Sequence, residues 1–341
     1  MTKNERCRLS FASLIFLLLG TPQPGALAET PNVVWEGSGK SGYLYSVAFS
    51  PDGQMVATGD GVPPVYDSCT GTLLYPGEGT VRLWNANDGT LLQSATADQT
   101  RVASVAFSPD AQQLASGSSS NLKLWSLPDL ASFRALSDYP WNEIRSVAFS
   151  PDGRFLAAGL AGNGNAVKVY GSDGTFRTLP FSRWVIALTF SSDSQFLAVA
   201  NATAIQIYRT SDWQFERVIS PQQGPNGPSA LAFSPNGETL ASSGPTVKLW
   251  RISDGTLVRE LPAGGQLAFS ADGQTLLIAG PPIGFWKVSD GSLLKTYDEP
   301  RAFILSVAFS PDNTLFGFTQ PTGDTYGSPG IVVVARNPLI P

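Results

Sequence analysis

Short runs of alternating apolar and polar residues follow one another along most of the chain, and turn sequences rich in Gly, Pro, Asp and Ser separate them. Alternation of this kind, in runs bounded by turn residues, is typical of half-buried β-strands. No stretch shows a convincing helical period. The pattern therefore predicts an all-β fold made of many short strands joined by turns.

One motif recurs along the chain: a Val-Ala-Phe or similar strand followed by a Ser-Pro-Asp-Gly turn. In this turn Pro fixes φ, Asp caps the backbone and Gly takes a positive φ. The copies are 46–53, 104–111, 146–153, 187–194, 230–237, 266–273 and 306–313, anchored by Phe49, Phe107, Phe149, Phe190, Phe233, Phe269 and Phe309. Seven copies, most of them about 40 residues apart, predict seven four-stranded units, because one unit needs about 40–45 residues.

Each unit has the same four predicted strands. The motif forms the first strand, the second follows the turn, and the third ends in an aromatic residue before a hairpin and an outer strand. The third-strand aromatic residues are Trp84, Trp125, Tyr170, Tyr208, Trp250 and Trp286.

The second strand varies together with this aromatic residue. A hydroxyl accompanies Trp in three units: Thr58 with Trp84, Ser116 with Trp125, and Ser242 with Trp250. Where the position holds Ala158 or Val199, the aromatic residue is Tyr. Trp286 stands with Ile278 and breaks the pattern. A buried indole N–H needs an acceptor, so we expect hydroxyl–indole hydrogen bonds in the three units that pair a hydroxyl with Trp.

The seventh unit lacks an outer strand after its third strand at 331–335. An unassigned apolar stretch, 32–36, precedes the first unit. Pairing of 33–35 with 331–335 would complete the last sheet and remove an exposed sheet edge. We therefore predict that this N-terminal strand completes the seventh unit and closes the ring.

These repeats resemble those of the WD-repeat β-propeller family over residues 31–336. The resemblance implies a seven-bladed propeller of four-stranded antiparallel blades as a single domain over 29–341. The chain lacks the family's Gly-His pair before the first strand and, in most units, the Asp between the second and third strands. Of the buried hydrogen-bonded set that these residues form in the family, only the pairing of Ser or Thr with Trp is expected here.

The N-terminal segment has the features of a secretory signal peptide over 1–28. Three basic residues precede the apolar run 9–19, and a Pro/Gly break leads to an Ala-x-Ala sequence at 26–28. The run is shorter than the roughly 20 apolar residues that span a bilayer. We predict cleavage near Ala28 and export to the periplasm or the cell exterior; an uncleaved anchor is the alternative.

Composition excludes several kinds of chemistry. The chain contains no His, which excludes Ser-His-Asp and Cys-His catalysis and His-ligated zinc. A net charge of −5 argues against a broad nucleic-acid surface, because binding phosphates requires a basic one. After cleavage only Cys69 would remain, so we expect no intramolecular disulfide. We predict no catalytic residue, metal or cofactor.

Two connections between second and third strands are long, 59–80 in the first unit and 319–330 in the seventh. These units are neighbours in a closed ring, and long loops on a rigid scaffold often carry binding residues. The candidate partner-binding residues on them are Tyr66, Asp67, Tyr75, Glu78, Asp324 and Tyr326, with a second group of Tyr139, Trp141 and Trp184 on the same face. The alternative is that both insertions are decoration, because surface insertions cost little stability.

Three functions stay open at this point. The first is an exported, non-catalytic, monomeric scaffold that binds a protein through its loop-bearing face, with no nucleic acid and no membrane span after cleavage. The second is a module whose aromatic residues stack on a small ligand or glycan. The third, a propeller-type enzyme, is disfavoured because the first-strand positions expected to face the channel hold Thr189 and otherwise Ala, with no recurring acid.

Overall fold

The computed structural model describes the strands of the repeats and most of their turns. The described residues are 33–39, 42–62, 65–66, 73–75, 77–119, 121–130, 133–138, 142–162, 166–181, 183–219, 228–298, 303–322 and 329–340. These residues form strands and turns but no helix, so none of them belongs to a membrane-spanning helix. The predicted signal peptide, 1–28, lies outside the described residues.

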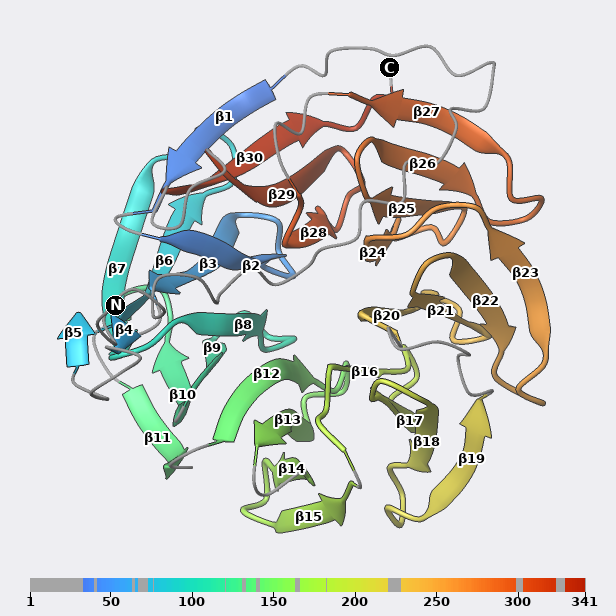
Figure 1. Cartoon of the computed structure of the whole chain (residues 1–341), viewed down its shortest axis with the longest axis horizontal. Coiled ribbons are helices and arrows are strands. Elements are labelled where there is room, and N and C mark those ends of the chain that lie inside the picture. The colour runs from blue at the N-terminus through green and yellow to red at the C-terminus, as the bar shows by residue number, and fades with distance from the viewer. Residues whose placement is uncertain are drawn as a thin grey trace, which may run out of the picture.

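Seven four-stranded antiparallel sheets stand around a central axis as the blades of a propeller (Figure 1). From the innermost strand outward, blade one contains β2 (Tyr43–Phe49), β3 (Met55–Val62), β6 (Glu78–Asn85) and β7 (Leu91–Asp98). Blade two contains β8 (Val102–Phe107), β9 (Gln113–Ser118), β10 (Asn121–Ser126) and β11 (Phe133–Asp138), and blade three contains β12 (Asn142–Phe149), β13 (Phe155–Gly162), β14 (Ala166–Gly171) and β15 (Phe176–Pro180).

The remaining blades repeat this order. Blade four contains β16 (Ala187–Phe190), β17 (Phe196–Ala200), β18 (Ile205–Arg209) and β19 (Phe215–Ile219), and blade five contains β20 (Ala230–Phe233), β21 (Thr239–Ser243), β22 (Val247–Arg251) and β23 (Leu257–Leu261). Blade six contains β24 (Gln266–Phe269), β25 (Thr275–Ala279), β26 (Ile283–Lys287) and β27 (Leu293–Tyr297), and blade seven contains β28 (Ser306–Phe309), β29 (Leu315–Pro321), β30 (Gly330–Arg336) and β1 (Val33–Ser38). The predicted seven-bladed all-β fold is confirmed.

The N-terminal strand closes the ring, as predicted. Strand β1 pairs antiparallel with β30, from Val33 opposite Ala335 to Ser38 opposite Ile331, and Figure 1 shows the two strands side by side. Trp35 of β1 is buried, and its indole N–H donates to the carbonyl of Ala86 in blade one (2.8 Å). Strand β1 therefore completes blade seven and also joins it to blade one.

Each turn between the first two strands of a blade is held by the Ser of the repeat and by an Asp, which is replaced by Asn236 in blade five. In blade one the backbone N–H of Met55 donates to Ser50 Oγ (2.9 Å), and that of Gln54 donates to Asp52 Oδ1 (3.0 Å). The hydroxyl of Ser50 donates to the same carboxylate, and this bond lowers the pKa of Asp52 below its usual value. The bond from the backbone of the second strand to the Ser hydroxyl recurs in each of the other six blades.

The expected hydroxyl–indole hydrogen bonds are present. The indole N–H groups donate from Trp84 to Thr58 (3.0 Å), from Trp125 to Ser116 (2.8 Å) and from Trp250 to Ser242 (2.8 Å). Trp286, the exception in the sequence, has a buried indole nitrogen with no partner among the described residues.

Neighbouring inner strands are joined through the Ser that begins the repeat motif. Backbone N–H groups donate from Val47 to Ser306, from Val105 to Ser46, from Val147 to Ser104 and from Leu188 to Ser146, each at 3.1 Å. These bonds connect blades seven, one, two, three and four in succession. Blades four, five and six have Ala187, Ala230 and Gln266 at the Ser position, so their side chains offer no hydroxyl there.

Candidate functional site

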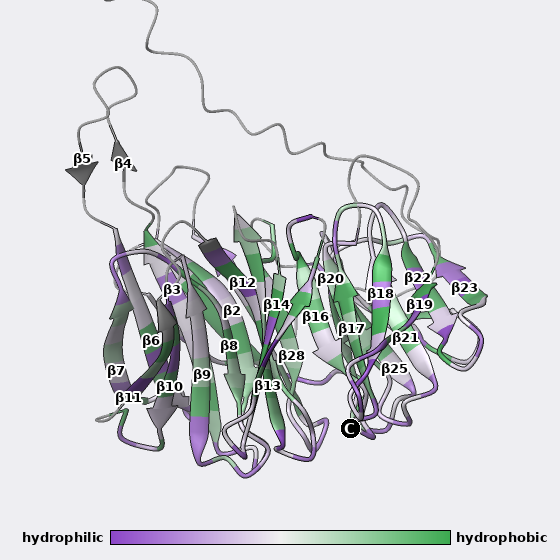
Figure 2. Cartoon of the chain, turned by 90° about the horizontal axis from the view of Figure 1, so that it is seen from below, coloured by the Kyte–Doolittle hydropathy of each residue, from purple (hydrophilic) through white to green (hydrophobic). Residues whose placement is uncertain are grey.

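The inner strands begin at the same face of the disc at which the second strands end, because Tyr43 of β2 pairs with Gly61 of β3. Figure 2 shows the disc from its side, with the C-terminus at the opposite face. The insertion of blade one leaves from the end of β3 and contains a short antiparallel hairpin of β4 (Val65–Tyr66) and β5 (Leu73–Tyr75).

The bases of the two long insertions lie next to each other. The backbone N–H of Gly330, where β30 begins, donates to the carbonyl of Gly42 (2.7 Å). Gly42 has a φ of +75°, and a Cβ at this position would lie 2.5 Å from the carbonyl oxygen of Gly61 at the end of β3. Only glycine fits here. The backbone of Gly42 thus bridges the start of one insertion and the end of the other.

Most of the candidate partner-binding residues lie, wholly or with their side chains, outside the part of the chain that the structure describes. Asp67, Tyr139, Trp141, Asp324 and Tyr326 are outside the described residues, and only the backbone of Tyr66 and Tyr75 is described. Two candidates are placed with their side chains. Glu78 is half-buried at the start of β6, and Trp184 is 56% exposed before the inner strand of blade four. The two-loop site therefore stays a prediction.

A row of aromatic and charged side chains follows the starts of the inner strands. The rings of Phe303 and Tyr43 meet edge to face at 6.0 Å, and Tyr43 meets Tyr45 at 6.1 Å. The guanidinium carbon of Arg101 lies 4.9 Å from the centre of the Tyr45 ring, within the range of a cation–π contact.

The row continues through a carboxylate held between two guanidinium groups. Arg101 Nε donates to Glu143 Oε1 and Arg145 Nε donates to Glu143 Oε2, each at 2.9 Å. Arg145 then lies over the ring of Trp184, with its guanidinium carbon 5.3 Å from the ring centre. We call this row the rim ladder: Phe303, Tyr43, Tyr45, Arg101, Glu143, Arg145 and Trp184.

Contacts within the rim ladder shift the pKa values of Arg101 and Glu143. Burial opposes the charge of Arg101, but Glu143 and then Tyr45 outweigh it and raise the pKa of the guanidinium. Burial would raise the pKa of Glu143, but Arg101 and Arg145 outweigh it and hold that pKa below its usual value. At neutral pH two positive charges therefore flank one negative charge.

Irregularities in the inner strands present these side chains. The pairing register shifts between Leu44 and Ser46, between Val102 and Ser104, and between Ile144 and Ser146. In each of these blades the residue two positions before the Ser is fully buried (Leu44, Val102 and Ile144). Its neighbours in sequence then face away from the core, and they include Tyr43, Tyr45, Arg101, Glu143 and Arg145. A β-bulge redirects side chains in this way at many functional sites.

A buried ion pair joins two strands of blade one beneath this face. Arg82 of β6 and Asp60 of β3 form an ion pair with both side chains almost completely inaccessible to solvent. The N–H of Thr80 also donates to Asp60 Oδ1 (3.0 Å). Burial lowers the pKa of Arg82, yet the paired carboxylate compensates its charge. The pair fixes the two strands between which the blade-one insertion leaves.

The profile for the WD domain, G-beta repeat, matches residues 30–85, 89–126, 135–177 and 216–251, together just over half of the chain. The chain belongs to the WD-repeat family. Three of the matched segments end directly after Trp84, Trp125 and Trp250, the indoles that are bonded to hydroxyls. WD-repeat propellers usually act as protein-interaction scaffolds and are typically non-catalytic. No curated protein sequence matches this chain significantly.

The rim ladder of this WD-repeat propeller was not predicted from the sequence, apart from Trp184. A sequence signal for it does exist. A buried aliphatic residue (Leu44, Val102 or Ile144) stands two positions before the Ser that begins the motif. The residues on either side of that position are aromatic or charged in most of these repeats. Sequence reasoning began at the Ser and so passed over them.

Proposed function

We propose that this WD-repeat propeller is an exported, non-catalytic scaffold that binds a protein partner across its loop-bearing face, with the rim ladder at the centre of the contact. The observation that carries the proposal is the continuous ladder of aromatic rings and arginines at the starts of the inner strands. Trp, Tyr and Arg are the residues most often responsible for binding energy at protein interfaces.

The exposure of the ladder supports this role. Trp184 and Phe303, at its two ends, are 56% and 40% exposed, so both ends of the ladder present a large apolar side chain to a partner. The residues between them are held in place by their mutual contacts, so little side-chain freedom would be lost on binding. Because two arginines flank one carboxylate, we infer that the partner brings an acidic group to this face.

Export rests on the signal-peptide pattern of residues 1–28. Expression of the full chain in its host, followed by fractionation and N-terminal sequencing, tests it. We expect an exported protein that begins at or near Glu29. Retention in the cytoplasm with an intact N-terminus would contradict export without affecting the rim ladder.

Site-specific crosslinking tests the binding face. A photoreactive amino acid placed at Trp184 should capture one predominant protein from the host. Phe215, which is 52% exposed on the outer strand β19, provides a matched control position. In the double variant Arg101→Gln, Arg145→Gln, the yield from position 184 should fall about ten-fold or more. The same set of proteins captured equally from both positions would contradict a specific interface at the rim.

A further inference from the structure

One junction between blades has an exposed residue at the position that is buried or half-buried in the other six blades. In every blade, the residue two positions after the third-strand aromatic position donates its N–H to the carbonyl of the residue just before the second strand. These plug positions are Ala86, Leu127, Ser172, Thr210, Ile252, Val288 and Asn337. Six of them are buried or half-buried, and only Ser172 of blade three is exposed.

The aromatic residue of blade three differs in the same way. Tyr170 is half-buried, whereas its counterparts in the other blades are buried: Trp84, Trp125, Tyr208, Trp250 and Trp286. In blade four, which also has Tyr, the ring of Trp213 packs against Phe155 and fills the corresponding space. Blade three therefore has both a smaller ring and an outward-facing polar residue at the position that closes the other junctions.

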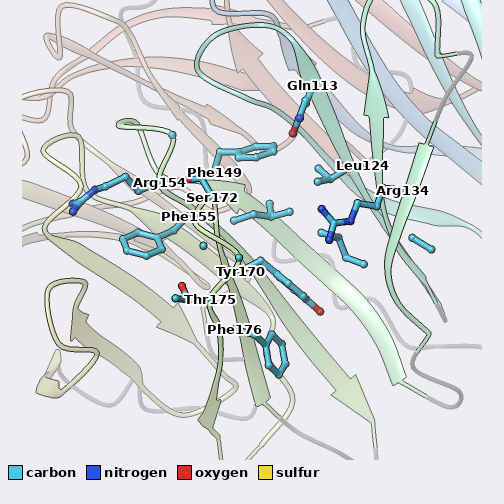
Figure 3. A pocket seen from close by; sticks show the side chains of 16 residues that line it. Gln113, Leu124, Arg134, Phe149, Arg154, Phe155, Tyr170, Ser172, Thr175 and Phe176 are labelled. Carbon is cyan, nitrogen blue, oxygen red and sulfur yellow. The ribbon is translucent and has the colours of Figure 1, made fainter.

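The result is a groove of about 570 Å³ between blades two and three, shown in Figure 3. One wall comes from blade two, with Leu124, Arg134 and Leu136. The other wall comes from blade three, with Tyr170 and Phe176. Phe149 and Leu156, on the two innermost strands, line it on the side of the channel. A volume of this size is typical of small-molecule sites.

The groove offers a ring surface on one wall and a positive charge on the other. The rings of Tyr170 and Phe176 lie 5.1 Å apart, and Phe176 is 52% exposed. On the facing strand, Arg134 is exposed and forms no ion pair with any described residue. The second arginine of the lining, Arg154, is paired with Asp152.

The charge of the lining contrasts with that of the whole protein. The chain has 27 acidic and 22 basic residues, yet the lining contains two arginines and no carboxylate. A ligand in this groove would therefore place a negative charge beside Arg134 without meeting a fixed negative charge in the lining.

We propose that the groove between blades two and three binds a small organic carboxylate with a planar aromatic body. The aromatic body lies against Phe176 and Tyr170, and the carboxylate pairs with Arg134, which can present two parallel N–H donors. The site is separate from the rim ladder and does not depend on the protein-scaffold proposal.

Titration calorimetry of the whole protein with three probes of the same ring tests the charge requirement. The probes are 2-naphthoate, neutral 2-naphthylmethanol and the cationic 2-naphthylmethylammonium. We expect 2-naphthoate to bind about ten-fold or more tightly than the neutral probe, and the cation to bind least. Equal affinity for all three probes, or no binding of 2-naphthoate, would overturn the proposal.

Variants then locate the site. Arg134→Gln should weaken 2-naphthoate to the affinity of the neutral probe, whereas Arg177→Gln, an equal charge change on β15, should have no effect. Ser172→Leu would supply an apolar plug like Leu127 or Ile252 in other blades, and it should abolish binding of every probe while the melting temperature stays unchanged or rises. Full binding by the Ser172→Leu protein, or equal loss in the Arg134→Gln and Arg177→Gln proteins, would place the bound probe elsewhere and refute the site.

Discussion

Blades one to three and blades four to six are built from the same repeat, yet they differ along the channel. The inner strands of the first group have seven, six and eight residues, and each carries a register shift near its start. Those of the second group have four residues each. The first group also provides the Ser hydroxyls that accept a hydrogen bond from the next blade, and five of the seven members of the rim ladder.

The difference shows how one repeat can vary at the start of its inner strand and keep the same fold. In blades four to six the inner strand is shorter, and the uncharged, non-aromatic residues Ile186, Ser229 and Gly265 stand directly before the motif. In blades one to three the added residues at the start of the strand raise aromatic and charged side chains at the channel mouth, while the Ser bonds hold these blades together. The proposed binding surface and the Ser hydrogen bonds thus occur in the same half of the ring.

The largest expected effect comes from breaking the closure beside blade one. Deletion of 29–38 removes β1 and the buried Trp35, and it exposes the edge of β30. We expect the melting temperature, followed by circular dichroism, to fall by about 10 °C or more, since loss of a buried Trp alone costs about 3–5 kcal/mol. Val33→Thr, at a more exposed position of β1, should change it little. An unchanged melt after the deletion would contradict the closure.

The next effect concerns the ion pair that is particular to blade one. Asp60→Asn leaves the buried guanidinium of Arg82 without its counter-charge, and we expect a loss of about 3–5 kcal/mol in the free energy of unfolding measured with urea. Asp88→Asn, in an exposed hairpin, serves as the control and should cost far less. Equal costs for the two substitutions would mean that the buried pair gives blade one no special stability.

A smaller effect should distinguish the two groups of blades directly. Ser104→Ala leaves the N–H of Val147 without its acceptor, and we expect a cost of about 1–3 kcal/mol. Ala187→Ser places a hydroxyl at the equivalent position of blade four, and it should be neutral or stabilise by up to about 1 kcal/mol. Urea unfolding of both variants tests this asymmetry. A Ser104→Ala protein as stable as the parent would show that the Ser bonds do not strengthen the first group.

The smallest effect per residue is the pH dependence contributed by the turns, which both groups share. Hydrogen bonds from Thr256 lower the pKa of Asp254 from 3.8 to about 2. The folded protein therefore holds this carboxylate ionised at a pH where the unfolded chain would protonate it. Its stabilisation is complete above about pH 4 and is lost as the pH falls towards about 2. Urea unfolding at several pH values should show a weaker acid dependence for Asp254→Asn than for the parent.

The fold could be predicted from the sequence because each blade contains the same recognisable pattern of strands and turns. The Phe-anchored motif sets the number of blades, the unpaired stretch before it identifies β1, and the hydroxyls opposite Trp84, Trp125 and Trp250 reveal hydrogen bonds within one sheet. All of these are relations inside a repeat or between the two ends of the chain, where alternation and polar satisfaction act locally.

The surfaces could be predicted only in part, because they arise between sheets. The rim ladder depends on register shifts that turn Tyr45 and Arg145 outward, and alternation alone does not show them. The groove depends on the space that Ser172 and Tyr170 leave open between blades two and three, and only a comparison of the equivalent positions in all seven blades reveals it. The loop residues proposed from the sequence, such as Tyr66 and Asp324, stay a prediction, because the side chain of Tyr66 and the whole of Asp324 lie outside what the structure describes.

The closure of the ring also sets an order of events during folding. Strand β1 is synthesised before any blade, but its partner β30 follows the last one, so the two are separated by almost the whole chain. Blade seven therefore cannot be completed until the rest of the propeller has been made, and pairings this distant in sequence form slowly. During that interval β1 has no partner strand in its own chain and can pair with β30 of another copy. Exchange of this strand between molecules is therefore the misfolded form that we expect.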